Sequence, residues 1–343
     1  MLVQPLVLSI LTTRRCTAAC DHCCVGAGPK ATDAIPIPRI HALLDEALAV
    51  PSIQRIGFSG GETFLLGDDL DDLIRHATSN GFHTRALSNG YWAKDAPTAM
   101  ARVATLREAG LRELMLSTGT FHQRFVPPAR VLHAARAAAE AGILTRVSVE
   151  TCDQSTVDPN AVREALADLI ARKLVFVGAD PWITDAGGRG QAALSHEALL
   201  AEGAGDAASG PCVQIMNVLT VTPRQELLAC CGYPMEELPR LRIASVANLT
   251  LAEAIANTPD SLFKMWLHVA GPSGIAEFVA RYLPGFTLPP SASICQSCAT
   301  IQRDARSMAI ISAHAAEIAR DLATHFQLSL HRNGSRSHRR ESP

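Results

Sequence analysis

Three cysteines near the start of the chain have a spacing suited to one metal centre. Cys16, Cys20 and Cys23 lie within eight residues, directly after an apolar segment expected to be a strand. Three thiolates around one centre leave a coordination position open, and an open position indicates chemistry, whereas four protein ligands indicate a structural role. A structural zinc site short of one ligand, or buried thiols without metal, are the alternatives that this spacing leaves.

A second group of cysteines follows in the other half of the chain. Cys212 and Cys230 bracket a hairpin pattern with 17 residues between them, Cys231 follows directly, and Cys295 and Cys298 form a C-x2-C loop. Four thiolates from two segments suit a closed, fully ligated site. The spacing alone leaves zinc and an iron–sulfur cluster both open.

The pattern of the first half of the chain predicts alternating strands and helices, which would position Cys16, Cys20 and Cys23. We expect six strands about 30 residues apart, apolar on both faces as in a parallel sheet covered by helices, and hence an α/β fold with a partial, TIM-like (β/α)6 barrel. Active sites of such barrels lie at the carboxyl ends of the strands. The strands are expected at 6–13, 53–59, 83–89, 112–117, 143–150 and 173–178, and the helices at 38–50, 68–80, 95–110, 128–142 and 158–172.

The pattern changes after about residue 179. Residues 187–210 are dense in Gly and Ala, which is typical of a linker. A hairpin over 213–221 and 226–229, short helices over 251–257 and 261–269, and a long helix over 301–326 are expected. We therefore divide the chain into a barrel (1–205), a small α+β region (206–300), a C-terminal helix (301–328) and a basic, disordered tail (329–343).

Composition excludes several classes of protein. The chain has 343 residues, 48% of them hydrophobic and 19% charged, with a formal net charge of −2. It is too apolar for a disordered protein, lacks the basic footprint of a nucleic-acid binder, and has no apolar run long enough to span a membrane. Ten cysteines without a secretion signal favour the reducing cytoplasm.

A second motif lies at the end of the second expected strand. Gly60, Gly61 and Glu62 form a GGE element, and the C-x3-C-x2-C spacing carries a flat residue, His22, before its last cysteine. Together these motifs resemble the radical S-adenosylmethionine (SAM) superfamily, over roughly residues 6–178. The resemblance implies a [4Fe–4S] cluster held by the three cysteines, with SAM on the fourth iron; Cys24 is expected to be a bystander.

The resemblance also assigns the residues that bind SAM. Gly60, Gly61 and Glu62 would bind the methionine end, and His22 would lie near the adenine. Asn89 and Ser117, at the ends of the third and fourth strands, and Arg146 in the fifth would approach the ribose and carboxylate.

The second cysteine group resembles the auxiliary-cluster region called a twitch domain, a shorter relative of SPASM regions. The C-x17-C spacing followed by C-x2-C implies one auxiliary [4Fe–4S] cluster, held by Cys212, Cys230, Cys295 and Cys298. The spacing match favours Cys230 over Cys231 as the ligand.

The resemblance implies cleavage of SAM to methionine and a 5′-deoxyadenosyl radical, which abstracts a substrate hydrogen atom. We expect oxidation of a sugar- or aminocyclitol-like natural-product intermediate, with an electron donor of the flavodoxin or ferredoxin type. Maturation of a ribosomal peptide by cross-linking or epimerisation is an alternative. So is sugar epimerisation, with Cys152 or Cys231 as hydrogen donor. A non-catalytic iron–sulfur scaffold or electron carrier is the alternative from another class.

Two features of the sequence bear on the class of substrate. The first strand begins within ten residues of Met1, so no N-terminal peptide-binding domain is expected, which favours a small molecule without excluding a peptide. Residues 117–126 resemble an S-x-D-x-x-H-x-x-F-V element of some members, but Gly119 replaces its Asp. His122 and Arg124 could face the substrate, and further pocket candidates follow the sixth strand, namely Trp182, Asp185 and Arg189.

Overall fold

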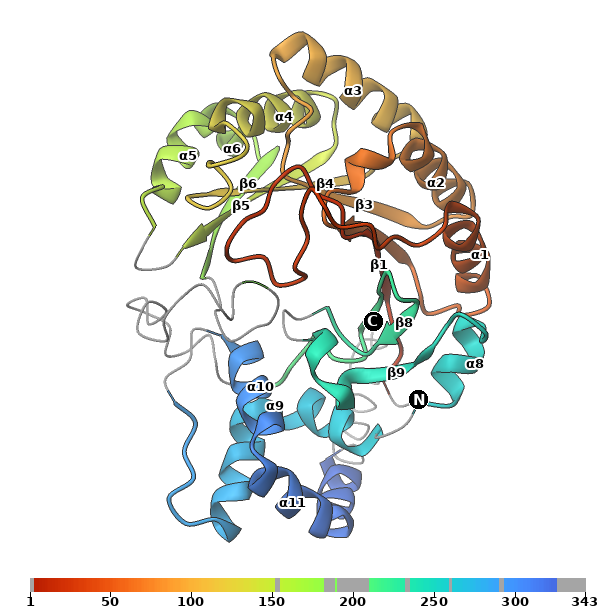
Figure 1. The fold of residues 1–343 in the computed structure, drawn as a ribbon, viewed down its shortest axis with the longest axis vertical. Coiled ribbons are helices and arrows are strands. Elements are labelled where there is room, and N and C mark those ends of the chain that lie inside the picture. Colours follow the sequence, from red (N-terminus) through yellow and green to blue (C-terminus); the bar gives the residue numbers. More distant parts are fainter. Residues whose placement is uncertain are drawn as a thin grey trace, which may run out of the picture.

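Six parallel strands form an arc in which each strand pairs with the next along the chain (Figure 1). The computed structural model describes residues 3–151, 155–181, 189, 210–231, 235–258, 261–289 and 293–325. The strands are β1 (Val7–Thr13), β2 (Arg55–Gly60), β3 (His83–Ser88), β4 (Glu113–Gly119), β5 (Leu144–Thr151) and β6 (Val175–Pro181). The α/β class, the partial barrel and the six strands predicted from the sequence are confirmed.

The helices that connect the strands lie on the outer, convex side of the arc (Figure 1). Helix α3 shows why they begin and end where they do: the Asp95 carboxylate accepts the N–H of Thr98, and Gly110 ends the helix with a φ of 99°. The expected helix over 158–172 is interrupted at Leu166. The helices are α1 (Ile37–Ala47), α2 (Asp68–Ser79), α3 (Ala96–Ala109), α4 (Pro128–Glu140), α5 (Pro159–Ala165) and α6 (Ala167–Ala171).

The two faces of the arc differ, contrary to the expectation of apolar burial on both. Side chains that alternate toward the helices, such as Ile56 and Leu114, are fully buried. On the concave side Leu87, Leu144 and Phe176 are exposed, at 37%, 47% and 56%. An arc of six strands does not close on itself, so its inner face is not filled as in a complete barrel.

The sheet continues beyond β1 into the second half of the chain. Strand β7 (Val218–Val221) pairs in parallel with β1, and β8 (Glu226–Leu228) and β9 (Arg242–Ser245) follow in antiparallel order. Among the described residues, one sheet of nine strands results. The predicted hairpin is confirmed, although its first strand begins at Val218. Because β7 pairs with β1, the region after residue 210 extends the sheet of the barrel.

The remaining elements are helical and include two corrections. The pair Cys295 and Cys298 lies in the first turns of a helix, where a loop was expected. The expected single helix over 301–326 is broken at Asp304, which adopts an extended conformation and caps a new helix through the N–H of Arg306; residues 305–313 and 315–325 are helical. The elements are 3-10 helices at Thr63–Leu66 (η1), Met235–Glu237 (η4) and Pro239–Leu241 (η5), and α8 (Leu251–Ala256), α9 (Ser261–Tyr282), α10 (Ile294–Arg303) and α11 (Ala305–Ala313).

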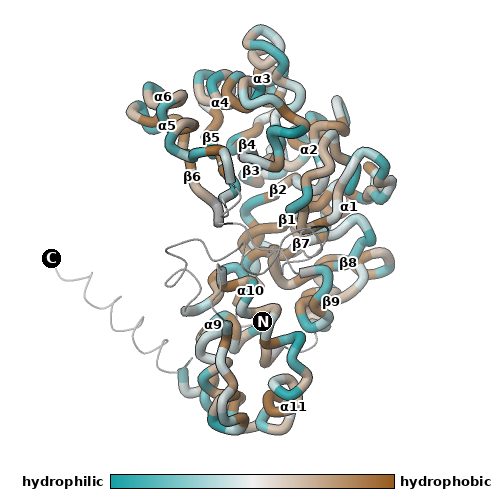
Figure 2. The backbone as a smooth tube through the Cα atoms, turned by 60° about the vertical axis from the view of Figure 1, so that its left-hand side comes forward, coloured by the Kyte–Doolittle hydropathy of each residue, from teal (hydrophilic) through white to brown (hydrophobic). Residues whose placement is uncertain are grey.

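Helix α9 is longer than the expected 261–269 and passes a kink at Gly271, whose φ is 65°. The backbone in Figure 2 alternates between hydrophilic and hydrophobic stretches along the helices around the sheet. None of the helices among the described residues combines the length and apolarity needed to cross a membrane. Cys152, Trp182, Asp185, most of the expected linker and the expected tail lie outside the described residues.

The carboxyl ends of β1 and β2 meet in a close backbone contact. The N–H of Gly61 donates to the carbonyl of Thr13 at 2.6 Å, and the N–H of Glu62 donates to that of Arg15 at 2.9 Å. A Cβ atom at Gly61 would collide with the carbonyl oxygen of Arg15 and lie 2.7 Å from that of Arg14. The absence of a side chain at this position is therefore what lets the chain after β1 pass so close to β2.

We predict that Gly61→Ala destabilises the protein by roughly 1–3 kcal/mol, the usual cost of an overpacked site. The neighbouring atoms are backbone and cannot rotate away. Gly57→Ala is the matched control, because a Cβ there would meet the Cα of Ser9 at an ordinary 3.9 Å. Urea unfolding of both variants measures the difference, and equal stability of the two would contradict the steric argument.

Candidate active site

The loop that follows β1, residues 14–28, carries the first three cysteines; we call it the cysteine loop. It lies on the concave side of the sheet (Figure 1). Backbone hydrogen bonds close it, from the N–H of Cys16 to the carbonyl of Gly28 and from the N–H of Gly28 to that of Arg14. Cys16 and Cys20 are buried and Cys23 is half-buried. The structure thus gathers these side chains at the carboxyl edge of the strands, as predicted.

The donors around the cysteine loop fit a metal centre bound by thiolates. The N–H of Ala18 donates to Sγ of Cys16 at 3.4 Å, and the N–H of Ala27 donates to Sγ of Cys23 at 3.3 Å. Burial raises the pKa of the Cys16 thiol to about 11 and raises that of Cys20 further. Thiols so placed stay protonated on their own, and binding of a metal centre is what would deprotonate them.

Two arginines hold the cysteine loop from outside. The Arg189 guanidinium donates to the carbonyl of Cys20 at 3.0 and 3.1 Å, and its backbone N–H donates to the carbonyl of Cys23. Arg14 donates to the carbonyl of Val25 and forms an ion pair with Glu236. Of the pocket candidates after β6, Arg189 therefore faces the cysteine loop.

Glu62 is fully buried between the ends of β2 and β3. Its carboxylate accepts the N–H of Asn89 at 2.8 Å and that of Phe64 at 3.1 Å. Burial raises its pKa to about 7, against the lowering effect of these two N–H groups. Binding of the methionine ammonium by Glu62 stays a prediction; what the structure adds is that this carboxylate ties the two strand ends together.

His22 is enclosed by aromatic side chains from the segment after β4. Its ring centroid lies 5.2 Å from that of Phe121 and 4.7 Å from that of His122. Burial lowers the pKa of His22 to about 2, so the imidazole is neutral. A neutral ring among aromatic groups is a suitable neighbour for a flat base such as adenine.

The other three predicted SAM-binding residues occupy different places. Asn89 is buried and its amide donates to Oγ1 of Thr17 at 3.1 Å, so it contacts the cysteine loop directly. Ser117 is half-buried near the end of β4. Arg146 is exposed and lies in the middle of β5, opposite Met115 of β4. Asn89 thus contacts the cysteine loop directly, and the roles of all three residues stay predictions.

Glu150 is a site residue that the sequence reasoning missed. It lies at the carboxyl end of β5, is 5% exposed, and accepts the N–H of Phe121 at 2.7 Å. Its other oxygen lies 3.1 Å from Nδ1 of His122. Its position at the end of an expected strand, where barrels build their sites, is the signal that could have identified it.

In the second cysteine group, burial and also the charges of Cys295 and Cys212 affect the pKa of the Cys298 thiol. Burial raises the pKa of the Cys298 thiol to about 12, and the charges of Cys295 and Cys212 contribute to this. Ser293 caps α10 by accepting the N–H of Cys295 at 3.1 Å, which fixes the start of the helix that carries both Cys295 and Cys298. Cys298 therefore lies within electrostatic range of Cys295 and Cys212, and the auxiliary site itself stays a prediction.

The neighbours Cys230 and Cys231 differ in their surroundings. Cys230 is 7% exposed and belongs to the main hydrophobic core. Cys231 is exposed, and its thiol donates to Oε1 of Gln214 at 3.9 Å. Cys231 is therefore the accessible thiol of the pair, whereas Cys230 is enclosed.

Cys24 connects the two cysteine groups in space. Burial raises the pKa of its thiol, and the charges of Cys23, Glu236 and Cys295 raise it further. Cys24 therefore lies within electrostatic range of both groups. The cysteine loop and the start of α10 are neighbours, although more than 260 residues separate them in the sequence.

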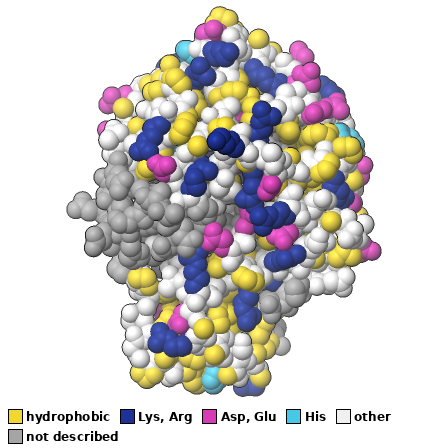
Figure 3. Space-filling view, in the orientation of Figure 1, with side chains coloured by type: hydrophobic (Ala, Val, Ile, Leu, Met, Phe, Trp, Pro, Cys, Tyr) yellow, Lys and Arg dark blue, Asp and Glu magenta, His cyan; other side chains and the backbone are white. Residues whose placement is uncertain are grey.

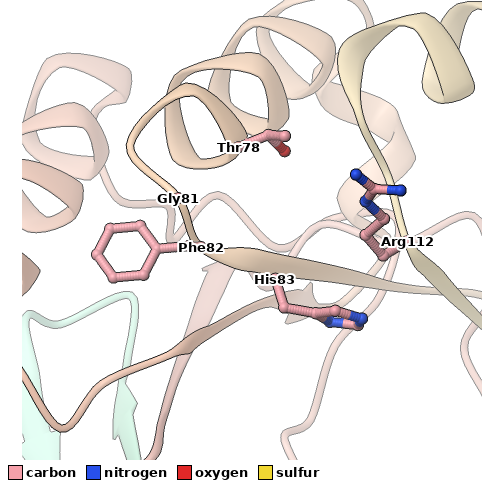
Figure 4. Close-up of a pocket in the computed structure, with 5 residues that line it drawn as sticks. All are labelled: Thr78, Gly81, Phe82, His83 and Arg112. Carbon is pink, nitrogen blue, oxygen red and sulfur yellow. The ribbon is translucent and has the colours of Figure 1, made fainter.

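A separate cavity of about 480 Å³ lies at the opposite edge of the sheet (Figure 4). It is lined by Phe82 and His83 before and at the start of β3, and by Arg112 before β4. Because these are the amino ends of the strands, the cavity is not part of the candidate site. Acidic and basic side chains are interspersed on the face shown in Figure 3.

Comparison with known proteins defines the class. Residues 10–172 match the model of the Radical SAM superfamily. The match covers slightly less than half of the chain, all of it in the barrel, so the barrel is similar to a radical SAM domain, which indicates an enzyme. Similarity to this superfamily implies a [4Fe–4S] cluster and SAM as cofactors.

The similar proteins include a curated relative and several solved structures. A curated relative is the "Putative peptide biosynthesis protein YydG" of Bacillus subtilis (strain 168), 29% identical over 119 residues; the match spans 35% of this chain and 37% of that protein. A structure of BtrN in complex with AdoMet and 2-DOIA is 16% identical, covers 79% of this chain and 89% of that one, and gives a TM-score of 0.46. A structure of SuiB of Streptococcus suis bound to S-adenosylmethionine is 16% identical, covers 66% of this chain and 60% of that one, and gives a TM-score of 0.44.

We predict that Glu62 makes stability depend on pH. A carboxyl whose pKa is higher in the folded than in the unfolded chain contributes stability at low pH, and this is lost as the pH rises through about 7. Between pH 5 and 8, wild type should lose on the order of 3 kcal/mol relative to Glu62→Gln, which does not titrate. Urea unfolding at both pH values measures this. Glu140→Gln, at an exposed carboxyl on α4, is the control, and an unchanged difference between wild type and Glu62→Gln would contradict the prediction.

Proposed function

We propose that this enzyme abstracts a hydrogen atom from a natural-product or peptide substrate and oxidises it, with one auxiliary [4Fe–4S] cluster beside the SAM-binding one. The observation that carries the proposal is the arrangement of the cysteine loop. Cys16, Cys20 and Cys23 offer three ligands on the concave side of the sheet, with the second cysteine group in electrostatic range through Cys24.

The cofactors supply the radical chemistry when bound, because electron transfer into SAM generates a radical able to cleave an unactivated C–H bond. The chain would hold the cofactors in position and protect them from water. Cys16, Cys20 and Cys23 would hold the cluster, and the backbone at Gly60 and Gly61 would receive the methionine end. Donors of the flavodoxin or ferredoxin type are the proposed source of electrons.

The concave face of the sheet is the proposed floor of the substrate site. It combines the exposed apolar side chains Leu87, Leu144 and Phe176 with the exposed Arg146. Apolar surface of this kind binds carbon frameworks and excludes water and competing hydrogen donors, while a cation orients an anionic group. The sugar-like intermediate and the peptide both remain compatible with this floor, and the name of the Bacillus relative supports the peptide.

Epimerisation is the second candidate, and Cys231 favours it. A hydrogen-atom donor must be a thiol and not a thiolate, because only the S–H bond can be cleaved homolytically. The Cys231 side chain is exposed, and a cysteine thiol is ordinarily protonated at neutral pH. In this reaction the S–H hydrogen atom passes to the substrate carbon radical, and an electron from the reductant and a solvent proton restore the thiol. Cys152, the other proposed donor, lies outside the described residues.

We predict that reconstituted wild type binds about eight iron atoms per chain, as two [4Fe–4S] clusters. With SAM and dithionite it should form 5′-deoxyadenosine. Cys16→Ala, Cys20→Ala and Cys23→Ala should each lose about four iron atoms and all 5′-deoxyadenosine, because one ligand of the open cluster is missing. The matched control is Cys24→Ala, which removes a neighbouring thiol. Retention of activity in any of the first three, or bound zinc in place of iron, would contradict the proposal.

A second prediction separates epimerisation from oxidation. With substrate in heavy water, epimerisation transfers solvent deuterium to carbon, because the thiol exchanges its hydrogen with solvent. Cys231→Ala should abolish this deuterium in the product while 5′-deoxyadenosine still forms. Mass spectrometry of the product measures both. A product two hydrogen atoms lighter and without deuterium supports oxidation and removes the role of Cys231.

A further inference from the structure

We propose that Glu150 is a positioning residue that holds the aromatic enclosure of His22 and, through it, the cysteine loop. The inference rests on the proposed SAM-binding site. One carboxylate bonds two consecutive residues, Phe121 and His122, and the rings of both lie against His22 between the second and third cysteines.

The geometry uses both oxygens of the carboxylate. Oε1 accepts the N–H of Phe121 at 2.7 Å, and Oε2 lies 3.1 Å from Nδ1 of His122. Glu150 is 5% exposed, so water does not compete for these bonds. The segment after β4 is therefore fixed to the end of β5 at two points, one on its backbone and one on an imidazole.

Gly119 is what admits the carboxylate. It lies opposite Glu150 in the pairing of β4 with β5, and its φ is 136°. A Cβ atom at residue 119 would collide with the Glu150 carboxylate. The resembling element has an Asp at this position, whereas this chain has Gly119. The volume that a side chain at residue 119 would take is occupied by the Glu150 carboxylate from the neighbouring strand β5.

The segment held by Glu150 contacts the cysteine loop in more than one way. Phe121 packs with Cys16, Cys20 and Ala27 in a small hydrophobic cluster. The Arg124 guanidinium donates to the Asp21 carboxylate at 2.5 Å. A shift of the 121–124 segment would therefore move both His22 and the surroundings of Cys20.

The ligand atoms of Cys20, His22 and His122 lie within 4.8 Å of one another. The Glu150 carboxylate thus acts on the cysteine loop through Phe121 and His122, without touching the reacting atoms itself.

The test compares three variants as reconstituted holoenzyme. Glu150→Ala removes both bonds. Glu150→Gln can keep both, because the amide oxygen accepts from Phe121 and the amide N–H donates to Nδ1 of His122 in its other tautomer. Gly119→Ala leaves the carboxylate in the sequence but displaces it. Glu140→Ala is the control for loss of an exposed carboxylate.

The readouts are the electron paramagnetic resonance spectrum of the reduced cluster with and without SAM, and the affinity for SAM. We expect Glu150→Ala and Gly119→Ala to weaken SAM binding by about 10–100-fold, the usual effect of losing an outer-shell partner, and to diminish the spectral response to SAM. Iron content and circular dichroism should stay those of wild type, and Glu150→Gln should restore both readouts.

A spectral response and affinity in Glu150→Ala equal to those of wild type would overturn the proposal. So would a loss in Glu150→Gln as large as in Glu150→Ala, since the charge and not the bonded geometry would then be decisive. Failure of wild type itself to respond to SAM would instead refute the proposed function, so the two failures are distinguishable.

Discussion

The contact between the ends of β1 and β2 is the constraint on which the rest of the site depends. The N–H groups of Gly61 and Glu62 donate to the carbonyls of Thr13 and Arg15, where the cysteine loop begins. No side chain fits at Gly61. The element that was expected to bind the methionine end thus also anchors the base of the cysteine loop, so the two parts of one cofactor site are coupled through the backbone.

Two buried carboxylates extend this anchoring along the carboxyl edge of the sheet. Glu62 joins the ends of β2 and β3 through the N–H groups of Phe64 and Asn89. Glu150 joins the ends of β4 and β5 through Phe121 and His122. A buried carboxylate is costly unless it is bonded, and each of these satisfies two donors that would otherwise be left without partners. Both carboxylates therefore join neighbouring strand ends at the edge that carries the candidate site.

The pairing of β7 with β1 decides where the second cysteine group lies. Strand β7 runs parallel to β1 with Val218 beside Val7, and β8 runs back antiparallel to β7, so Cys212 comes before the amino end of β7 and Cys230 follows where β8 returns toward that end. Two interactions join the cysteine loop to the region after residue 210. Arg14 forms an ion pair with Glu236, and burial raises the pKa of the Cys24 thiol with a contribution from the charge of Cys295. The region that carries the second cysteine group is therefore continuous with the sheet of the barrel, and the auxiliary cluster in it stays a proposal.

The sequence by itself determined the six strands, the helices between them and the three-cysteine motif, because hydrophobic period, capping residues and local spacing are all recorded within short stretches. It did not determine the break at Asp304 or the helical setting of Cys295, since both depend on capping bonds that compete with an apolar pattern. Only the tertiary structure brought Glu150 to Gly119 and Cys24 near Cys295. Such pairs join residues distant in the chain, and the register of neighbouring strands, which no local pattern records, decides which side chain fills which space.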